Sequence, residues 1–198
     1  MEQVNKVRVA MVCHFSNAEV RSHLPLDESR KLYTFLRKVL GMPSKGKGYG
    51  DIAPWDTSAI RFFREREEID LHVISAHSGL KKRVVSYEDQ GVHYSFVRCE
   101  RATMLKRVVP NAKLWQKMNP MVKDVHRLVD QIKPDIVLLM GLENAYYSGT
   151  VLGLKGYPVY GLCQTVYNNP ERAVFAKVDA INAATEMSII KEHRYFGV

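Results

Sequence analysis

The sequence predicts an α/β domain: a three-layer, Rossmann-like fold with a mostly parallel sheet and helices on both faces. Apolar, β-branched runs at 7–15, 69–77, 136–140 and 159–163 are typical of strands that are covered on both sides. Segments with helical periodicity separate these runs, and no internal repeat interrupts the alternation. Strands joined through helices require right-handed crossovers, and these place neighbouring strands parallel.

The first half of the chain predicts two helices between its first two strands. Apolar residues recur every three or four positions over 32–40, and Gly41 ends that helix. A second, shorter helix is predicted over 57–68, because Thr57 or Asp56 can cap its first turn.

The middle of the chain follows the strand at 69–77 with two short extended pieces around Gly91. The strongest helical periodicity covers 114–132, and Pro120 interrupts it. We therefore expect Asn119 to cap a fresh helix, or the helix to kink at this point.

The last third begins with the buried strand at 136–140, followed by a helix around 145–154 and the strand at 159–163. An apolar piece at 178–184 comes next. A final helix is predicted from Thr185, which can cap it, to about Phe196, with Gly197 ending it.

Bulk composition indicates one domain in a reducing compartment. The chain has 198 residues, a net charge of +8 and three widely spaced cysteines, Cys13, Cys99 and Cys163. A basic surface suits nucleic acid, an anionic membrane or a phosphorylated small molecule, although charge runs are also common on solvated surfaces. The sequence shows neither a membrane-length apolar run nor a signal-peptide pattern, so a cytoplasmic location is expected.

Ligands of an open parallel sheet bind beyond the carboxyl ends of its strands. The loops to examine are therefore 14–19, 76–80, 141–148 and 163–168. They contain the polar side chains most able to form a binding site.

Residues 141–148, "GLENAYYS", carry the most specific expectations. Gly141 allows a turn, and Asn144 can cap the next helix and leave its amides free for a phosphate or carboxylate. Glu143 can accept a hydroxyl hydrogen bond or act as a base; alternatively, it favours the helix dipole. Tyr146 and Tyr147 are expected to divide between packing and the rim.

Four segments resemble the N-terminal domain of a family 4 glycosyltransferase of the two-Rossmann-domain GT-B architecture. They are "KVRVAMVCHFSNAEV", "FFREREEIDLHVISAHSGL", "VDQIKPDIVLLMGLENAYYSGTVLGLKGYPVYGLCQT" and "DAINAATEMSIIKEHRYFGV". The likeness covers nearly the whole chain through the order and spacing of these segments.

The resemblance implies a retaining transfer of a sugar from a nucleotide-sugar to a glycan or lipid-linked hydroxyl, as in bacterial cell-envelope polysaccharide synthesis. The chain would be the acceptor-binding half, 1–198, at the inner face of a membrane or free in the cytoplasm. A C-terminal domain that binds the nucleotide-sugar is the expected partner. No metal is expected, and this half alone is expected to be inactive.

The resemblance also assigns binding residues but no certain catalytic residue. The candidates for acceptor binding are Glu143, Asn144, Tyr146, Gln164 and His77. The loop with Ser16 and Asn17 is the candidate for the donor phosphates.

Four positions depart from the family pattern. Met140 and Gln164 stand where many members have histidine, and Ser16-Asn17 replaces a frequent glycine pair. A thioether is a poor hydrogen-bonding group for a sugar hydroxyl. Glu143 or Gln164 then takes the polar role, or the acceptor is held differently.

The alternative reading is a stand-alone α/β module that binds an anionic ligand or nucleic acid. "RFFRER" at 61–66 interleaves aromatic and basic residues, as nucleic-acid modules do. The glycines at 46, 48 and 50 follow a helix rather than the first strand, which argues against a dinucleotide fingerprint. His72 and His77 do not have metal-ligand spacing.

Overall fold

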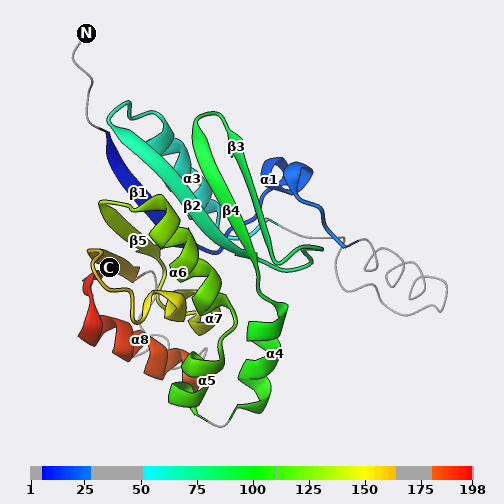
Figure 1. The fold of residues 1–198 in the computed structure, drawn as a ribbon, viewed down its shortest axis with the longest axis vertical. Coiled ribbons are helices and arrows are strands. Elements are labelled where there is room, and N and C mark those ends of the chain that lie inside the picture. The colour runs from blue at the N-terminus through cyan, green and yellow to red at the C-terminus, as the bar shows by residue number, and fades with distance from the viewer. Residues whose placement is uncertain (1–5, 28–50, 110, 164–179, 198) are drawn as a thin grey trace, which may run out of the picture.

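A seven-stranded sheet forms the centre of the computed structural model, which describes residues 6–27, 51–109, 111–163 and 180–197. The strand order is β3-β4-β2-β1-β5-β6-β7 (Figure 1). The strands are β1 (Val7–Cys13), β2 (Ile69–His77), β3 (Val84–Asp89), β4 (Val92–Arg98), β5 (Ile136–Met140), β6 (Val159–Cys163) and β7 (Arg194–Gly197). All neighbouring pairs are parallel except β3–β4, so the predicted mostly parallel α/β sheet is confirmed.

Helices cover both faces of the sheet, with α6 in front and α3 behind in Figure 1. The helices are α1 (Ala18–His23), α3 (Pro54–Arg64), α4 (Glu100–Val108), α5 (Ala112–Met118), α6 (Met121–Ile132), α7 (Ala145–Ser148) and α8 (Ala180–Glu192). Ile60 of α3 belongs to the same buried cluster as Met11, whereas Val125 of α6 belongs to the cluster of Val12. Alternate residues of β1 thus enter opposite cores, which explains its uninterrupted apolar sequence. Among the described residues, no helix has the length and apolar character that crossing a bilayer requires.

The Lys133-Pro134-Asp135 stretch fixes the start of β5 beside β1. Lys133 ends α6 in the left-handed conformation, with φ 52°. The Asp135 carboxylate accepts a hydrogen bond from the Arg8 amide at 2.8 Å, and the Asp135 amide donates to the Arg8 carbonyl at 2.9 Å. Asp135 thus pairs with Arg8 through both its side chain and its backbone. This pairing fixes the register of β5 against β1, in which the two strands end at the same edge of the sheet.

The two extended pieces predicted around Gly91 form the β3–β4 hairpin. Gln90 and Gly91 both have positive φ, 48° and 75°, as a two-residue hairpin turn requires. Tyr87 and Tyr94 pair across the two strands with stacked rings 5.1 Å apart.

Pro120 separates α5 from α6, so the prediction of a fresh helix is confirmed. The Asn119 side chain accepts a hydrogen bond from the Met121 amide at 3.0 Å. The helix expected at 145–154 is shorter: α7 is followed by a 3₁₀ turn over Gly149–Val151.

The predicted start of α3 was wrong. The helix begins at Pro54, ahead of Thr57 and Asp56, and its N-cap is Ala53 with φ 51° and no side-chain hydrogen bond. Proline suits the first helical turn because its fixed φ is already helical and its missing N–H would be unpaired there. The helix predicted over 32–40 lies outside the described residues.

The C-terminal prediction was also wrong. Helix α8 already includes Ala180, and Thr185 is buried inside it rather than at its cap. Residues 194–197 form β7, parallel to β6, with Gly197 opposite Cys163. The free edge of β6 offers unpaired backbone groups, and pairing with them outweighs continuation of the helix.

Candidate functional site

The loops after β1, β2 and β5 meet at one edge of the sheet because these strands are parallel and adjacent. A set of polar side chains lies there, and we call it the carboxyl-end cluster. Its members are His14, Ser16, Arg21, His77, Glu143 and Tyr146. The sequence placed four of these residues at a ligand site; His14 and Arg21 were not among them.

His14 and Tyr146 form the centre of this cluster. The Tyr146 hydroxyl is hydrogen-bonded to Nδ1 of His14, and the two rings lie edge to face with centroids 5.3 Å apart. Burial, helped by repulsion from His77, lowers the pKa of His14 from 6.5 to about 4. Burial is the main cause of the raised pKa of Tyr146, and the Cys99 charge adds to it. The Tyr146 hydroxyl therefore keeps its proton at neutral pH. Neutral His14 has a single ring proton, and the Tyr146 hydroxyl can pair with Nδ1 of either tautomer, as donor or as acceptor.

His77 at the end of β2 has a defined tautomer. Its Nδ1 lies 2.6 Å from the Ser78 carbonyl, which can only accept, so Nδ1 carries the proton. In the neutral ring, Nε2 is then an acceptor, and it lies 3.4 Å from the Ser16 hydroxyl. Arg21 donates to the same hydroxyl at 3.1 Å, and Asp51 accepts from Arg21 at 2.7 Å.

Ser16 and His77 are both buried, with exposed fractions of 1% and 2%. A serine beside an imidazole nitrogen suggests a nucleophile, but a substrate carbonyl needs access to the hydroxyl oxygen. Burial of both groups favours a positioning role, in which they hold the loop after β1 against β2.

The backbone of the predicted donor-phosphate loop is already engaged. The Ser16 amide donates to the Ile52 carbonyl at 3.1 Å, and the Ile52 amide donates back at 2.8 Å. The Asn17 side chain accepts from the Val20 amide at 2.9 Å and so caps α1. These contacts account for both residues locally, and the phosphate role stays a prediction.

The β5–α7 segment behaves partly as its sequence predicts. Gly141 has φ 86°, which permits the turn after the strand. Asn144 is the N-cap of α7 by position, but its side chain makes no capping hydrogen bond, and it is exposed. The Ala145 amide donates to the Asn182 side chain of α8 at 3.1 Å, so this amide is not available to a ligand.

Glu143 is 7% exposed, so it is a buried acid rather than a rim residue. Burial is the main cause of the raised pKa of Tyr147, and the Glu143 charge adds to it. The Tyr147 hydroxyl donates to the Met140 carbonyl at 3.0 Å. Of the two tyrosines, Tyr147 therefore packs, while Tyr146 is the partly exposed one that reaches His14.

Met140, where the sequence resemblance leads to the expectation of a histidine, is a core position in this chain. Met140 is 6% exposed and belongs to the apolar cluster on the α3 face. His14, one strand away, supplies an imidazole at the same edge. Its signal in the sequence was its place directly after the first strand. Gln164 lies outside the described residues.

Among the described residues, one group has donor atoms close enough together to hold a metal ion: Asp70, His72 and His93. These residues lie at the amino ends of β2 and β4, away from the carboxyl-end cluster.

Comparisons with models of protein families, with curated proteins and with solved structures each gave no match. The geometry and the sequence resemblance are therefore the grounds for assigning a function.

Proposed function

We propose that this chain is the acceptor-side domain of a retaining glycosyltransferase of GT-B architecture. The carboxyl-end cluster binds a hydroxyl of a glycan or lipid-linked acceptor, and a second Rossmann-like domain presents the nucleotide-sugar. The observation that carries the proposal is a neutral imidazole, His14, fixed by Tyr146 at the edge where open parallel sheets bind ligands. The reaction type rests on the sequence resemblance.

The protonation states of the cluster suit a hydroxyl ligand. A sugar hydroxyl both donates and accepts, so its site needs groups of each kind. Neutral His14 offers a donor or an acceptor at Nε2, according to its tautomer, and the exposed Asn144 offers an amide with both functions. A neutral imidazole also avoids repelling the positive charge that develops on the sugar ring during transfer.

The basic surface favours a lipid-linked or membrane-associated acceptor. Lys81, Lys82 and Arg83 are exposed and follow directly on the β2 loop. Each cation near an anionic membrane contributes about 1 kcal/mol of binding. Arg83 also pairs with the Asp124 carboxylate at 2.6 Å, so Lys81 and Lys82 are the cations that would bring the cluster close to the headgroups.

Binding of the acceptor can be tested by following backbone amide chemical shifts during titration with an oligosaccharide library. We expect saturable shifts at His14 and in the 141–146 segment. Tyr146→Phe should weaken binding about 2- to 10-fold, because it removes the hydrogen bond that orients His14. His126→Gln is the matched control, since His126 bonds the Thr150 carbonyl away from this edge. Equal affinity of Tyr146→Phe and wild type would contradict the proposal.

The transfer reaction needs the enzyme with both domains. Asn144→Ala should lower the rate of transfer without changing the thermal unfolding temperature, because its side chain is exposed and makes no capping bond. Glu143→Gln tests the buried acid while keeping its volume. Unchanged turnover in both variants would refute the assignment of this segment.

A second candidate function, nucleic-acid binding, is favoured by the outer face of α3. Trp55 and Phe62 are 54% and 53% exposed, and they lie two helical turns apart on one side. The Arg66 guanidinium lies 4.6 Å from the centroid of the Phe62 ring. Exposed aromatic and cationic side chains stack on bases. Binding to nonspecific nucleic acid that weakens steeply with salt, and that Phe62→Ala reduces, would support this candidate.

A further inference from the structure

A groove of about 500 Å³ lies on the α6 face of the sheet, at the amino ends of β2 and β4. The strand residues that line it are polar, unlike those farther along the same face. Asp70 and His72 belong to β2, and His93 of β4 is the register partner of His72. Strand residues that pack under a helix are usually apolar, so the polar residues here indicate a candidate ligand site.

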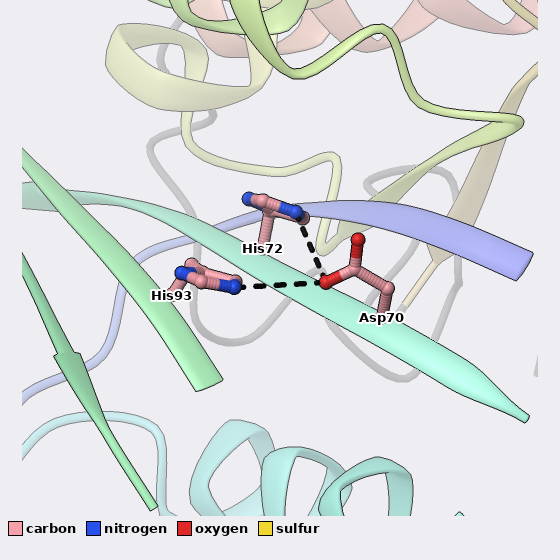
Figure 2. A group of neighbouring side chains, drawn as sticks. All are labelled: Asp70, His72 and His93. Atoms are coloured by element: carbon pink, nitrogen blue, oxygen red, sulfur yellow. Dashed lines mark ion pairs between the residues drawn. The ribbon is translucent and has the colours of Figure 1, made fainter. Parts of the chain in front are cut away.

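Three side chains converge in this groove (Figure 2). Oδ1 of Asp70 lies 3.2 Å from Nε2 of His72 and 3.7 Å from Nε2 of His93. All three donor atoms lie within 4.8 Å of one another. Ligand atoms about 2.1 Å from a tetrahedral metal are roughly 3.4 Å apart, so the spacing of the donor atoms suits one ion once the two imidazoles turn out of their stack to face it.

The outer atoms of this group are held by further partners. Nε of Arg8 donates to Oδ2 of Asp70 at 2.9 Å, which leaves Oδ1 facing the imidazoles. Oε2 of Glu88 lies 3.5 Å from Nδ1 of His93, on the far side of the ring from Nε2. A carboxylate behind a ligating histidine and a hydrogen bond behind a ligating carboxylate are the supports that metal sites use.

One donor atom lacks a well-directed hydrogen bond. Nε2 of His72 is buried and makes no hydrogen bond of acceptable geometry, although it is within ion-pair distance of Asp70. The rings of His72 and His93 stack with centroids 4.5 Å apart, so both Nε2 atoms point the same way. This nitrogen lies beside a carboxylate and a second imidazole, which is an arrangement in which the three groups can share one cation.

We propose that Asp70, His72 and His93 bind one divalent transition-metal ion of the Zn²⁺ class, with an open coordination position facing the groove. Two imidazoles and one carboxylate suit Zn²⁺, Co²⁺ or Ni²⁺, whereas Mg²⁺ and Ca²⁺ prefer oxygen ligands alone. Three protein ligands leave at least one position for water or a small ligand. This site goes beyond the proposed transfer function, for which no metal was expected.

The site can be tested on the tag-free, metal-stripped chain by calorimetric titration with Zn²⁺ under reducing conditions. We expect one ion per chain and a stabilising shift of the unfolding temperature by Zn²⁺ but not by Mg²⁺. His93→Gln and His72→Gln should abolish this binding. Glu88→Gln should weaken it about 10- to 100-fold, because Glu88 only supports the ligand.

His23→Gln is the matched control. His23 and His93 have similar exposed side-chain fractions, 44% and 43%, and each lies beside a carboxylate. The control variant should bind Zn²⁺ as the wild type does. Absence of Zn²⁺ binding by the wild type, or binding that survives both His72→Gln and His93→Gln, would overturn the proposal. Absence of binding by the wild type overturns the proposal whether or not a variant folds, and circular dichroism of each variant shows which of them can be used to locate the ion.

Discussion

The low pKa of His14 predicts a specific loss of stability in mild acid. The perturbation is His14→Asn, because the Asn side-chain amide can replace Nδ1 as the hydrogen-bond partner of Tyr146 whether the hydroxyl donates or accepts. The pKa of His14 is about 4 in the folded chain, against 6.5 when unperturbed. Between these values the unfolded chain binds a proton that the folded chain does not. Stability is therefore lost as pH falls from 6.5 toward 4, and the variant should escape this loss.

The magnitude follows from the two pKa values. At pH 5 the difference in proton binding should lower the free energy of unfolding of the wild type by about 2 kcal/mol relative to pH 7. Urea unfolding of both proteins at the two pH values gives this number as a double difference, in which the other titrating groups cancel. The groups near His14 are His77, Tyr146 and Tyr147. The same loss of stability in wild type and variant would show that His14 is not held neutral by the fold.

Two backbone positions and one buried side chain give further predictions. Gly161→Ala should destabilise the fold by about 1–3 kcal/mol in urea unfolding, because its Cβ would lie 2.9 Å from Cδ1 of the fully buried Leu142; an unchanged midpoint would mean that Leu142 moves freely. Lys133→Gly should stabilise by up to about 1 kcal/mol, since Lys133 has φ 52° at the end of α6; a lower midpoint would show that its side chain matters more than its backbone. Trp115→Phe should lower stability by about 1–2 kcal/mol, because Trp115 is fully buried and its Nε1 donates to the Ala102 carbonyl; thermal unfolding at equal protein concentration measures this, and no loss would argue against that hydrogen bond.

The sheet could be predicted from the sequence because its strands are buried on both faces. Strands covered on both sides have almost continuous apolar sequences, and β2, β5 and β6 begin and end where the sequence placed them. The errors occurred where local signals were weaker than long-range pairing. Residues 194–197 look like the end of a helix, but their pairing with β6 decides their structure.

The sequence predicts where the candidate site lies in the fold, but not which of its side chains contact one another. Parallel strands bring the loops after β1, β2 and β5 together whatever the side chains are, so His77 and Tyr146 were expected at this edge. The pairing of His14 with Tyr146 depends on how the loop after β1 turns, and a single sequence does not contain that information. The contact of His72 with His93 likewise depends on the register of β2 and β4, because the two residues are far apart in the sequence.

The partners of the imidazoles distinguish the two polar ends of the sheet. At the carboxyl end, His14 and His77 are hydrogen-bonded to a hydroxyl and a carbonyl, which are neutral oxygens. Such partners add no charge beside the imidazoles, and the carbonyl also fixes the tautomer of His77. At the amino end, His72 and His93 lie beside carboxylates, and carboxylates strengthen an imidazole as a ligand for a cation. His72 and His77 are five residues apart on the same strand, or roughly 16 Å at the rise of an extended chain. One strand thus carries two chemically opposite environments, far enough apart for a substitution at either end to leave the other intact.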